Sequence, residues 1–258
     1  MDDVARLNPK DRGDIITTAA SQLGITARVV EKDFWVCWVL RRLFTLKQPP
    51  AGLLFKGGTS LSKVYKAINR FSEDVDLSFN RADLGFPGVD ELLQLSRKKR
   101  DTTLDELTAR CRELVRGEYL RQLRESFNAA LRGGSTDWEL SVSDDEQDGQ
   151  TLLFRYPAAV EKGRGPSPSY VVDAVRLEFG ARSDHWPVED QTVTPYAAEA
   201  LPRQFGDATV NVRVLSAERT FWEKATILHM WHYAPQDKQF RDRQSRHYYD
   251  LAMLAKHD

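Results

Sequence analysis

The chain has 258 residues, enough for one large domain or two small ones with a buried core. Hydrophobic residues make up 41% and charged residues 29%, which excludes an intrinsically disordered chain. The net charge of -1 excludes a surface that is basic throughout, so any contact with nucleic acid has to come from a local patch.

The compartment expected from the sequence is the cytoplasm. The N-terminal segment, residues 1–4, is acidic and lacks the apolar core of a signal peptide. The most apolar stretch, residues 34–44, contains two arginines and is too short to span a bilayer. Cys37 and Cys111 show no metal-ligand spacing, so both are predicted to be reduced thiols in the core.

Hydrophobic periodicity and turn residues predict an irregular succession of helices and strands. The helix over 26–46 carries a wide apolar band, which implies that it is buried. The expected elements are, in chain order, helices over 9–24 and 26–46, strand 53–55, helix 59–68, strand 75–79, helices 90–100 and 103–131, strands 138–142, 152–156, 171–179 and near 210–215, and helices 216–232 and 245–256. The polar segments 143–150, 161–169 and 234–244 are expected to be loops. The fold class predicted is α/β (mixed α+β), a mixed sheet flanked by helices with a helical C-terminal part.

The segment 70–79 carries the clearest chemical pattern. Side chains on a strand alternate between two faces, so Asp74, Asp76 and Ser78 are predicted to share one face. The apolar residues between them anchor the other face. Two carboxylates this close repel each other unless a cation lies nearby, and carboxylate oxygens suit Mg²⁺. A divalent ion, or else a lysine or arginine, is therefore expected beside the pair.

A Gly-Gly turn precedes this strand. Lys56, Gly57 and Gly58 follow a short apolar strand, and Thr59 and Ser60 open the next helix. Glycine lets a phosphate approach the main chain closely, and the free N–H groups at a helix N-terminus favour an anion. The Ser60 hydroxyl is a further donor, and Lys56 is either a phosphate ligand or a structural partner. The turn is therefore predicted to hold nucleotide phosphates.

Each half of this pattern is weak alone, because Gly-Gly turns are common and paired carboxylates are often solvated or ion-paired. Together, in the order strand, turn, helix and carboxylate strand, they are much more specific for phosphoryl chemistry. The alternative is an aspartyl-phosphate phosphatase with Asp74 as the nucleophile of the segment 74–78. Such a motif normally ends an apolar N-terminal strand, and the preceding residues 70–73 do not fit that context.

The segments Glu31–Trp35, Phe55–Lys63 and Arg70–Leu77 resemble the AbiEii/AbiGii toxin family of the polymerase-beta-type nucleotidyltransferase superfamily. The resemblance implies a two-lobed α/β protein that moves a nucleotide from an NTP to an acceptor. The expected cofactor is Mg²⁺, with Mn²⁺ as the alternative ion. We expect residues 1–205 to form the catalytic domain with its N-terminal helices, and residues 206–258 to form a mostly helical lobe that completes the cleft.

The resemblance also implies partners. In some members the acceptor resembles the 3′ end of tRNA, and members are the toxin half of bacterial toxin–antitoxin or abortive-infection pairs. An NTP, a tRNA acceptor and a cognate antitoxin are therefore expected, with the chain acting as a monomer. The alternatives are nucleotidyl transfer to a protein (NMPylation) and a catalytically inactive NTP-binding partner module.

Members of the superfamily usually carry a third carboxylate on a later central strand. Glu178 is preferred here because it lies near the end of its strand, just before Gly180. Asp173, earlier on the same strand, is the rival. Alternation places Arg176 and Glu178 on one face, so a surface ion pair between these two side chains is the alternative interpretation of Glu178.

The C-terminal part adds further expected site residues by resemblance. Lys224 falls inside the apolar stripe of its helix, so it needs an anionic partner such as a triphosphate, or it has to snorkel to solvent. Asp250 keeps the second acid of the family's last motif, whereas His247 replaces the first acid and its role stays open. A basic and aromatic cluster nearby suits single-stranded RNA, and it comprises Arg241, Arg243, Arg246, Tyr248 and Tyr249.

The complete set of expected site residues has three parts. The expected catalytic residues are Asp74, Asp76, Glu178, Lys224 and Asp250. The expected metal ligands are Asp74, Asp76 and Glu178. The expected nucleotide-binding residues are Lys56, Gly57, Gly58, Thr59, Ser60, Ser72 and Lys224.

Overall fold

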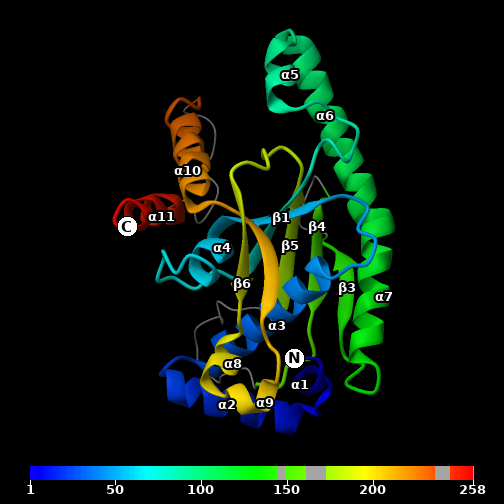
Figure 1. Cartoon of the computed structure of the whole chain (residues 1–258), viewed down its shortest axis with the longest axis vertical. Coiled ribbons are helices and arrows are strands. Elements are labelled where there is room, and N and C mark those ends of the chain that lie inside the picture. Colours follow the sequence, from blue (N-terminus) through cyan, green and yellow to red (C-terminus); the bar gives the residue numbers. More distant parts are fainter. Residues whose placement is uncertain (144–148, 161–172, 236–244, 258) are drawn as a thin grey trace.

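A mixed sheet organises the chain, and the computed structural model describes residues 1–143, 149–160, 173–235 and 245–257 (Figure 1). Its seven strands run in the order β3-β4-β5-β2-β1-β7-β6. The central strand β2 pairs in parallel with β5 and antiparallel with β1, and β1 pairs in parallel with β7. The strands are β1 Leu53–Lys56, β2 Asp74–Phe79, β3 Glu139–Val142, β4 Thr151–Arg155, β5 Ala174–Gly180, β6 Val188–Val193 and β7 Val210–Leu215.

Helices flank this sheet, so the predicted mixed α/β fold is confirmed. Figure 1 shows α10 and α11 beside α4 at one side of the molecule, and α5 with the start of α6 beyond the end of the sheet. The helices are α1 Asp2–Arg6, α2 Pro9–Leu23, α3 Ala27–Phe44, α4 Gly57–Lys63, α5 Val89–Gln94, α6 Arg97–Leu114, the π-helical turn η1 Val115–Tyr119, α7 Leu120–Leu131, α8 Tyr196–Ala200, α9 Pro202–Phe205, α10 Ala217–His232 and α11 Ser245–Leu254.

The core lies between one face of the sheet and the helices α3, η1 and α7. Trp35 and Trp38 of α3 are fully buried, with ring centroids 5.8 and 5.7 Å from that of Phe154 on β4. Phe79 of β2 stacks on Phe179 of β5 at 5.3 Å. Aromatic pairs of this kind add about 0.5–1.5 kcal/mol each beyond the burial of apolar area. Because this face is filled by apolar packing, the carboxylates of β2 point to the opposite face.

Three consecutive charged residues of α3 are buried, and each has a partner from another part of the chain. Glu31 accepts hydrogen bonds from the backbone N–H groups of residues 159 and 160. Lys32 forms an ion pair of 2.6 Å with Glu73, next to the carboxylate strand. Asp33 forms one of 2.8 Å with Lys63 at the end of α4. These paired charges fix α3 against the elements that carry the Gly-Gly turn and β2.

The helix boundaries differ from the sequence prediction in two places. The expected break between 100 and 103 is wrong, because α6 begins at Arg97 after its cap, Ser96, whose hydroxyl accepts a hydrogen bond from the backbone N–H of Lys99. From there α6, η1 and α7 continue without interruption to Leu131. The helix expected over 59–68 instead covers 57–63, so the glycines belong to its first turn.

Strand β6 and the short helices α1, α8 and α9 were not predicted. β6 reads Val-Glu-Asp-Gln-Thr-Val and lies at the edge of the sheet, where polar side chains meet solvent, so the usual apolar signal of a strand is weak. The strand expected over 171–179 begins at Ala174, and residues 161–172 lie outside the described part. The loop expected over 234–244 falls mostly outside it as well.

The division into 1–205 and 206–258 stays a prediction. Strand β7, which follows residue 205, lies inside the sheet between β1 and β6, and α10, which comes next in the chain, contacts α11. Both cysteines are buried thiols outside any disulfide, as predicted. Of the helices in the described part, none is long and apolar enough to cross a membrane.

Candidate active site

The Gly57-Gly58 turn touches the carboxylate strand directly. Gly57 has a φ of +78°, and a Cβ at this position would overlap the side chain of Asp76. A Cβ on Gly58 would lie 2.7 Å from the Ser72 hydroxyl oxygen. Only glycine combines this backbone conformation with this approach. The glycines predicted to admit a phosphate are thus also required to admit Asp76 and Ser72.

The sheet register gathers the expected carboxylates. Asp76 of β2 lies opposite Lys56 on β1 and beside Glu178 on β5. Asp74 lies beside Arg176 on the same neighbouring strand. The rival acid, Asp173, forms an ion pair of 2.8 Å with Arg28 of α3. Of the two candidates for a third carboxylate, Glu178 is therefore the one adjacent to Asp76.

Arginine side chains offset the repulsion between these carboxylates. Arg176 Nε lies 4.0 Å from Asp74 Oδ1 and 3.6 Å from Glu178 Oε1. Arg246 of α11 approaches the other oxygen of the same carboxylate, with Nη1 3.7 Å from Asp74 Oδ2. Burial raises the pKa of Asp76, Asp74 raises it further, and the charge of Lys56 acts in the opposite direction. Cations therefore lie beside Asp74 and Asp76, as expected from the sequence, and they are the guanidinium groups of Arg176 and Arg246.

The metal ligands expected from the sequence fit only in part. Within the described residues, no three Asp, Glu, His or Cys side chains are gathered closely enough to hold one ion. Glu178 faces Arg176, which leaves Asp74 and Asp76 as the paired oxygen donors. Mg²⁺ is commonly bound by one or two carboxylates together with substrate phosphates and water. Asp74 and Asp76 satisfy that requirement, whereas ligation by Glu178 would require its carboxylate to turn away from Arg176.

The hydroxyl groups of the turn are used internally. Thr59 donates to the carbonyl of Asp74, and Ser60 donates to the carbonyl of Gly57 at 2.9 Å. Both side chains are fully buried. Lys56 forms an ion pair of 2.9 Å with Glu223 of α10. Thr59 and Ser60 therefore hold the turn against β2, and Lys56 ties the sheet to the C-terminal helices.

A buried charge cluster joins the C-terminal helices to the segment before β2. Asp250 of α11 is fully buried and accepts two hydrogen bonds from Arg70, both 2.8 Å long. Lys224 of α10 lies 2.9 Å from the same carboxylate and is 6% exposed, so it does not snorkel to solvent. Burial would raise the pKa of Asp250, but the hydrogen bonds from Arg70 and the charge of Lys224 hold it below its usual value. Two cations against one carboxylate leave a positive surplus at this edge of the cleft.

Two cavities meet at Asp76 and Lys56. A small one of about 120 Å³ is bounded by the turn, by Asp74 and by α10 and α11, and its cationic lining is Lys56, Arg70, Lys224 and Arg246. Ser72 also lines it. A second cavity of about 470 Å³ lies on the other side of Asp76 and includes Glu178 in its lining. The site is thus a cleft with one side where cations outnumber acids by four to three and one side where they are balanced.

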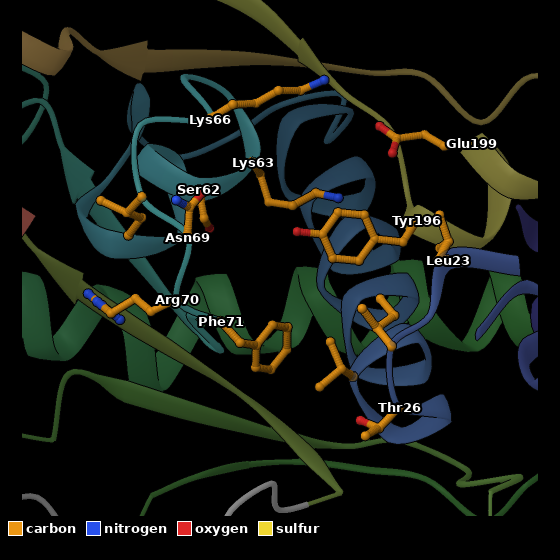
Figure 2. A pocket seen from close by; sticks show the side chains of 13 residues that line it. Leu23, Thr26, Ser62, Lys63, Lys66, Asn69, Arg70, Phe71, Tyr196 and Glu199 are labelled. Carbon is orange, nitrogen blue, oxygen red and sulfur yellow. The ribbon is translucent and has the colours of Figure 1, made fainter. Parts of the chain in front are cut away.

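A third cavity, of about 700 Å³, lies outside the cleft, between α2, α3, α4 and α8 (Figure 2). Phe71 and Tyr196 face its open centre, while the side chain of Arg70 points away from it. Glu199 is the one acid of its lining, within the described part of the chain. Although it is the largest of the three, it lacks the paired carboxylates that metal-assisted chemistry requires.

His247 lies half-buried beside the cationic side of the cleft. Its ring stands edge-on to Trp231 at 5.2 Å, and its Nδ1 has no hydrogen-bond partner in the described residues. Burial, and then the charges of Lys224 and Arg246, lower the pKa of His247 from 6.5 to about 4. The lowered pKa favours a neutral imidazole at pH 7, and His247 lines the small cavity of the cleft.

The lowered pKa of His247 predicts how the stability of the fold changes at acidic pH. The unfolded chain takes up a proton at His247 near pH 6.5 and the folded chain does so only near 4, so stability is lost as the pH falls through this window. We expect the thermal unfolding midpoint of His247→Phe to fall less between pH 6.5 and 4 than that of the wild type. His229→Phe, on the exposed face of α10, should keep the wild-type slope. Equal slopes for all three proteins would contradict this assignment.

The contacts of Arg70, Glu223 and Arg246 were not predicted from the sequence. Arg70 and Glu223 lie within segments that resembled the family, but nothing local indicated that they bind Asp250 and Lys56. Arg246 was expected to contact RNA, and it approaches Asp74 instead. The two other arginines of that expected cluster, Arg241 and Arg243, lie outside the described residues.

The family described as "Nucleotidyl transferase AbiEii toxin, Type IV TA system" matches residues 38–258. Among solved structures, MenT4, a nucleotidyltransferase toxin from Mycobacterium tuberculosis, is similar at 20% sequence identity and a TM-score of 0.45. The match covers 82% of this chain and 58% of that chain, so the chain spans a little over half the length of that relative. No curated protein matches the chain.

Proposed function

Because the chain belongs to the AbiEii family of nucleotidyltransferase toxins of type IV toxin–antitoxin systems, we propose that it transfers a nucleotide from an NTP to the 3′ end of a tRNA. The observation that carries this proposal is the close approach of the Asp76 carboxylate to the backbone of Gly57. It brings a carboxylate suited to a metal ion into contact with a turn suited to phosphate. Hydrolysis through an aspartyl phosphate, the earlier alternative, would not use that turn.

Asp74 and Asp76 are proposed to hold Mg²⁺, with Mn²⁺ as the alternative ion. When bound, the ion neutralises the charge that develops on the transferring phosphoryl group. Arg176 and Arg246 lie within 4.0 Å of Asp74 and keep the carboxylate neutralised before the substrate arrives. Arg246 also lines the same cavity as Lys224, which would allow its guanidinium to turn from Asp74 to a phosphate bound there.

The polyphosphate of the NTP is proposed to occupy the small cationic cavity. Arg70 and Lys224 already share Asp250, so they stay fixed and charged without paying a further ordering cost when a phosphate binds. Gly57 and Gly58 also line this cavity, and their backbone N–H groups are proposed as further donors to the phosphates. This assigns Asp250 a positioning role, because its carboxylate is covered by the two cations rather than open to the substrate.

Labelled nucleotides provide the test of this function. The purified chain is incubated with each α-labelled NTP, Mg²⁺, and either total RNA or total cellular protein. We expect label in RNA of tRNA size, loss of labelling with a chelator, and labelling by one NTP in preference to the others. Label in protein would move the acceptor to the NMPylation alternative. Nucleotide binding with no transfer to either would leave only an NTP-binding module, and phosphate release from an aryl phosphate would favour the phosphatase.

The toxin role is proposed on family membership alone, together with a cognate antitoxin, a monomeric acting unit and the cytoplasm as the compartment. Expression of the wild-type chain in bacteria is expected to arrest growth. Expression of the Asp76→Asn variant at the same level should not. Arrest by both proteins would separate toxicity from the carboxylate site and would count against this proposal.

A further inference from the structure

The two cavities that meet at Asp76 differ in chemistry. The small one gathers Arg70, Lys224 and Arg246, which suits a polyphosphate. The 470 Å³ cavity is lined by apolar side chains together with uncharged polar groups, two acids and two cations, so its charges balance. Its volume lies within the range of about 300–1,000 Å³ that is usual for small-ligand sites. Its lining comprises Lys56, Asp76, Leu77, Ser78, Leu107, Thr108, Gln150, Glu178, Phe179, Gly180, Ala181, Arg182 and Ser183.

The geometry of nucleotidyl transfer assigns the two sides different substrates. The attacking hydroxyl oxygen and the leaving pyrophosphate oxygen lie roughly in line across the α-phosphorus. If the pyrophosphate occupies the cationic cavity, the hydroxyl arrives from the opposite side of Asp76, which is the side of Glu178. We propose that the 470 Å³ cavity binds the terminal nucleoside of the RNA acceptor, an inference that rests on the proposed function.

The reaction balances in this arrangement. The hydroxyl oxygen of the acceptor forms the new bond to the α-phosphorus. The bond from that phosphorus to the bridging oxygen breaks, and pyrophosphate leaves with the electron pair toward Arg70 and Lys224. The hydroxyl proton passes to the carboxylate of Glu178, which lies beside Asp76 in the sheet register.

A buried and unused hydroxyl group gives independent support. Ser78 is 1% exposed, its Oγ has no hydrogen-bond partner within the described residues, and it lines the 470 Å³ cavity. An unsatisfied buried polar group costs about 1–3 kcal/mol, so such groups usually mark a missing partner. A polar atom of a nucleoside would supply that partner.

The mouth of the cavity is held in place by hydrogen bonds. Arg182 donates to the Thr108 hydroxyl at 3.1 Å, which links the end of β5 to α6 across the opening. Lys56 donates to the Ser183 hydroxyl, and Arg81 donates to the carbonyl of Arg182. The Arg182 side chain is 62% exposed and forms only a long, exposed ion pair of 4.0 Å with Asp105, so its guanidinium can also contact the phosphate that precedes the terminal nucleoside.

The test measures the KM for the RNA acceptor and the KM for the NTP donor separately. With short RNA acceptors, we expect Ser78→Ala to raise the KM for RNA about tenfold, the loss of one hydrogen bond, and to leave the KM for NTP unchanged. Arg182→Gln should raise the same KM. It should also lower the slope of log KM against log salt concentration by about 1, the value expected for the loss of one phosphate contact. Acceptors ending in each of the four nucleosides then show whether Gln150→Leu changes the preference at the terminal position. Ser62→Ala, a serine in the separate cavity of Figure 2, is the control and should change neither constant.

The outcomes are distinguishable from failure of the proposed function. If the wild type labels no RNA, the proposed function itself fails. If the wild type labels RNA and Ser78→Ala and Arg182→Gln both change only the KM for NTP, the cavity binds the donor nucleoside and the inference is overturned. Unchanged constants in both variants would overturn it as well. Because Ser78→Ala removes an unsatisfied group, its unfolding midpoint should not fall, which guards against a trivial folding defect.

Discussion

Replacing Asp76 with asparagine is expected to lower nucleotide transfer about a thousandfold, as is usual when a central electrostatic group of an active site is removed. Asp76 is the residue at which the Gly-Gly turn, Lys56 and Glu178 meet, and it lines both cavities of the cleft. Asparagine keeps the shape of the side chain and removes the charge that would hold a divalent ion. The measurement is the initial rate of label transfer to RNA at saturating NTP and Mg²⁺.

The same substitution should not destabilise the protein. Burial raises the pKa of Asp76, so the folded state disfavours its ionised form and stability falls as the pH rises above the ordinary pKa of 3.8. Removing the charge is therefore expected to leave the unfolding midpoint at pH 7 unchanged or higher. Mg²⁺ should raise the midpoint of the wild type but not that of the variant.

Asp190→Asn, on the exposed edge strand β6, is the matched control and should keep both activity and the effect of Mg²⁺. A folded Asp76→Asn variant that transfers label at the wild-type rate would show that the carboxylate face is not the reaction centre. A variant that simply unfolds would contradict the inference that Asp76 is kept for chemistry at the expense of stability.

The second large effect is expected from Gly57→Ala. An added Cβ would overlap the Asp76 side chain, so either the turn or the carboxylate has to move. A displacement of about 1 Å in a catalytic group costs on the order of a hundredfold in rate. We expect at least that loss in transfer. We also expect a loss of stability greater than the roughly 1–2 kcal/mol that a φ of +78° imposes on alanine.

The chain offers a closely matched control. Gly85 has a φ of +83°, and a Cβ there would meet nothing within 4 Å. Gly85→Ala therefore carries the same backbone penalty without the clash. The difference in unfolding free energy between the two variants, and a difference in transfer rate confined to Gly57→Ala, would measure the contact with Asp76. Equal losses of stability and of transfer rate in the two variants would show that the contact between Gly57 and Asp76 does not contribute to function.

Much of the site was predictable because its signals are local. A Gly-Gly pair after a short apolar strand restricts the backbone to a turn, and alternation along β2 places Asp74 and Asp76 on one face whatever the rest of the chain does. The apolar band of α3 likewise predicts burial from its own residues. Resemblance to the family extended the prediction to Lys224 and Asp250, which the structure places together at 2.9 Å.

Other features gave no local signal. β6 is polar because it lies at the sheet edge. The helix break expected near residue 102 falls inside α6, which continues through the π-helical turn η1 into α7. Position along one strand does not decide whether Glu178 or Asp173 is the third carboxylate. The register with β2 separates them, because it puts Glu178 beside Asp76 and leaves Asp173 to Arg28.

The sequence by itself determined the turn, the carboxylate face, the buried helix α3 and the class of chemistry, because each depends on backbone conformation and periodicity over a few residues. Only the tertiary structure determined which charged side chains form ion pairs with each other. Arg70 and Asp250 are 180 residues apart, and Arg246 reaches Asp74 from the last helix. The tertiary structure also determined that Asp76 lies between the two cavities of the cleft. Such pairings depend on packing free energy summed over the whole chain, which local patterns do not report.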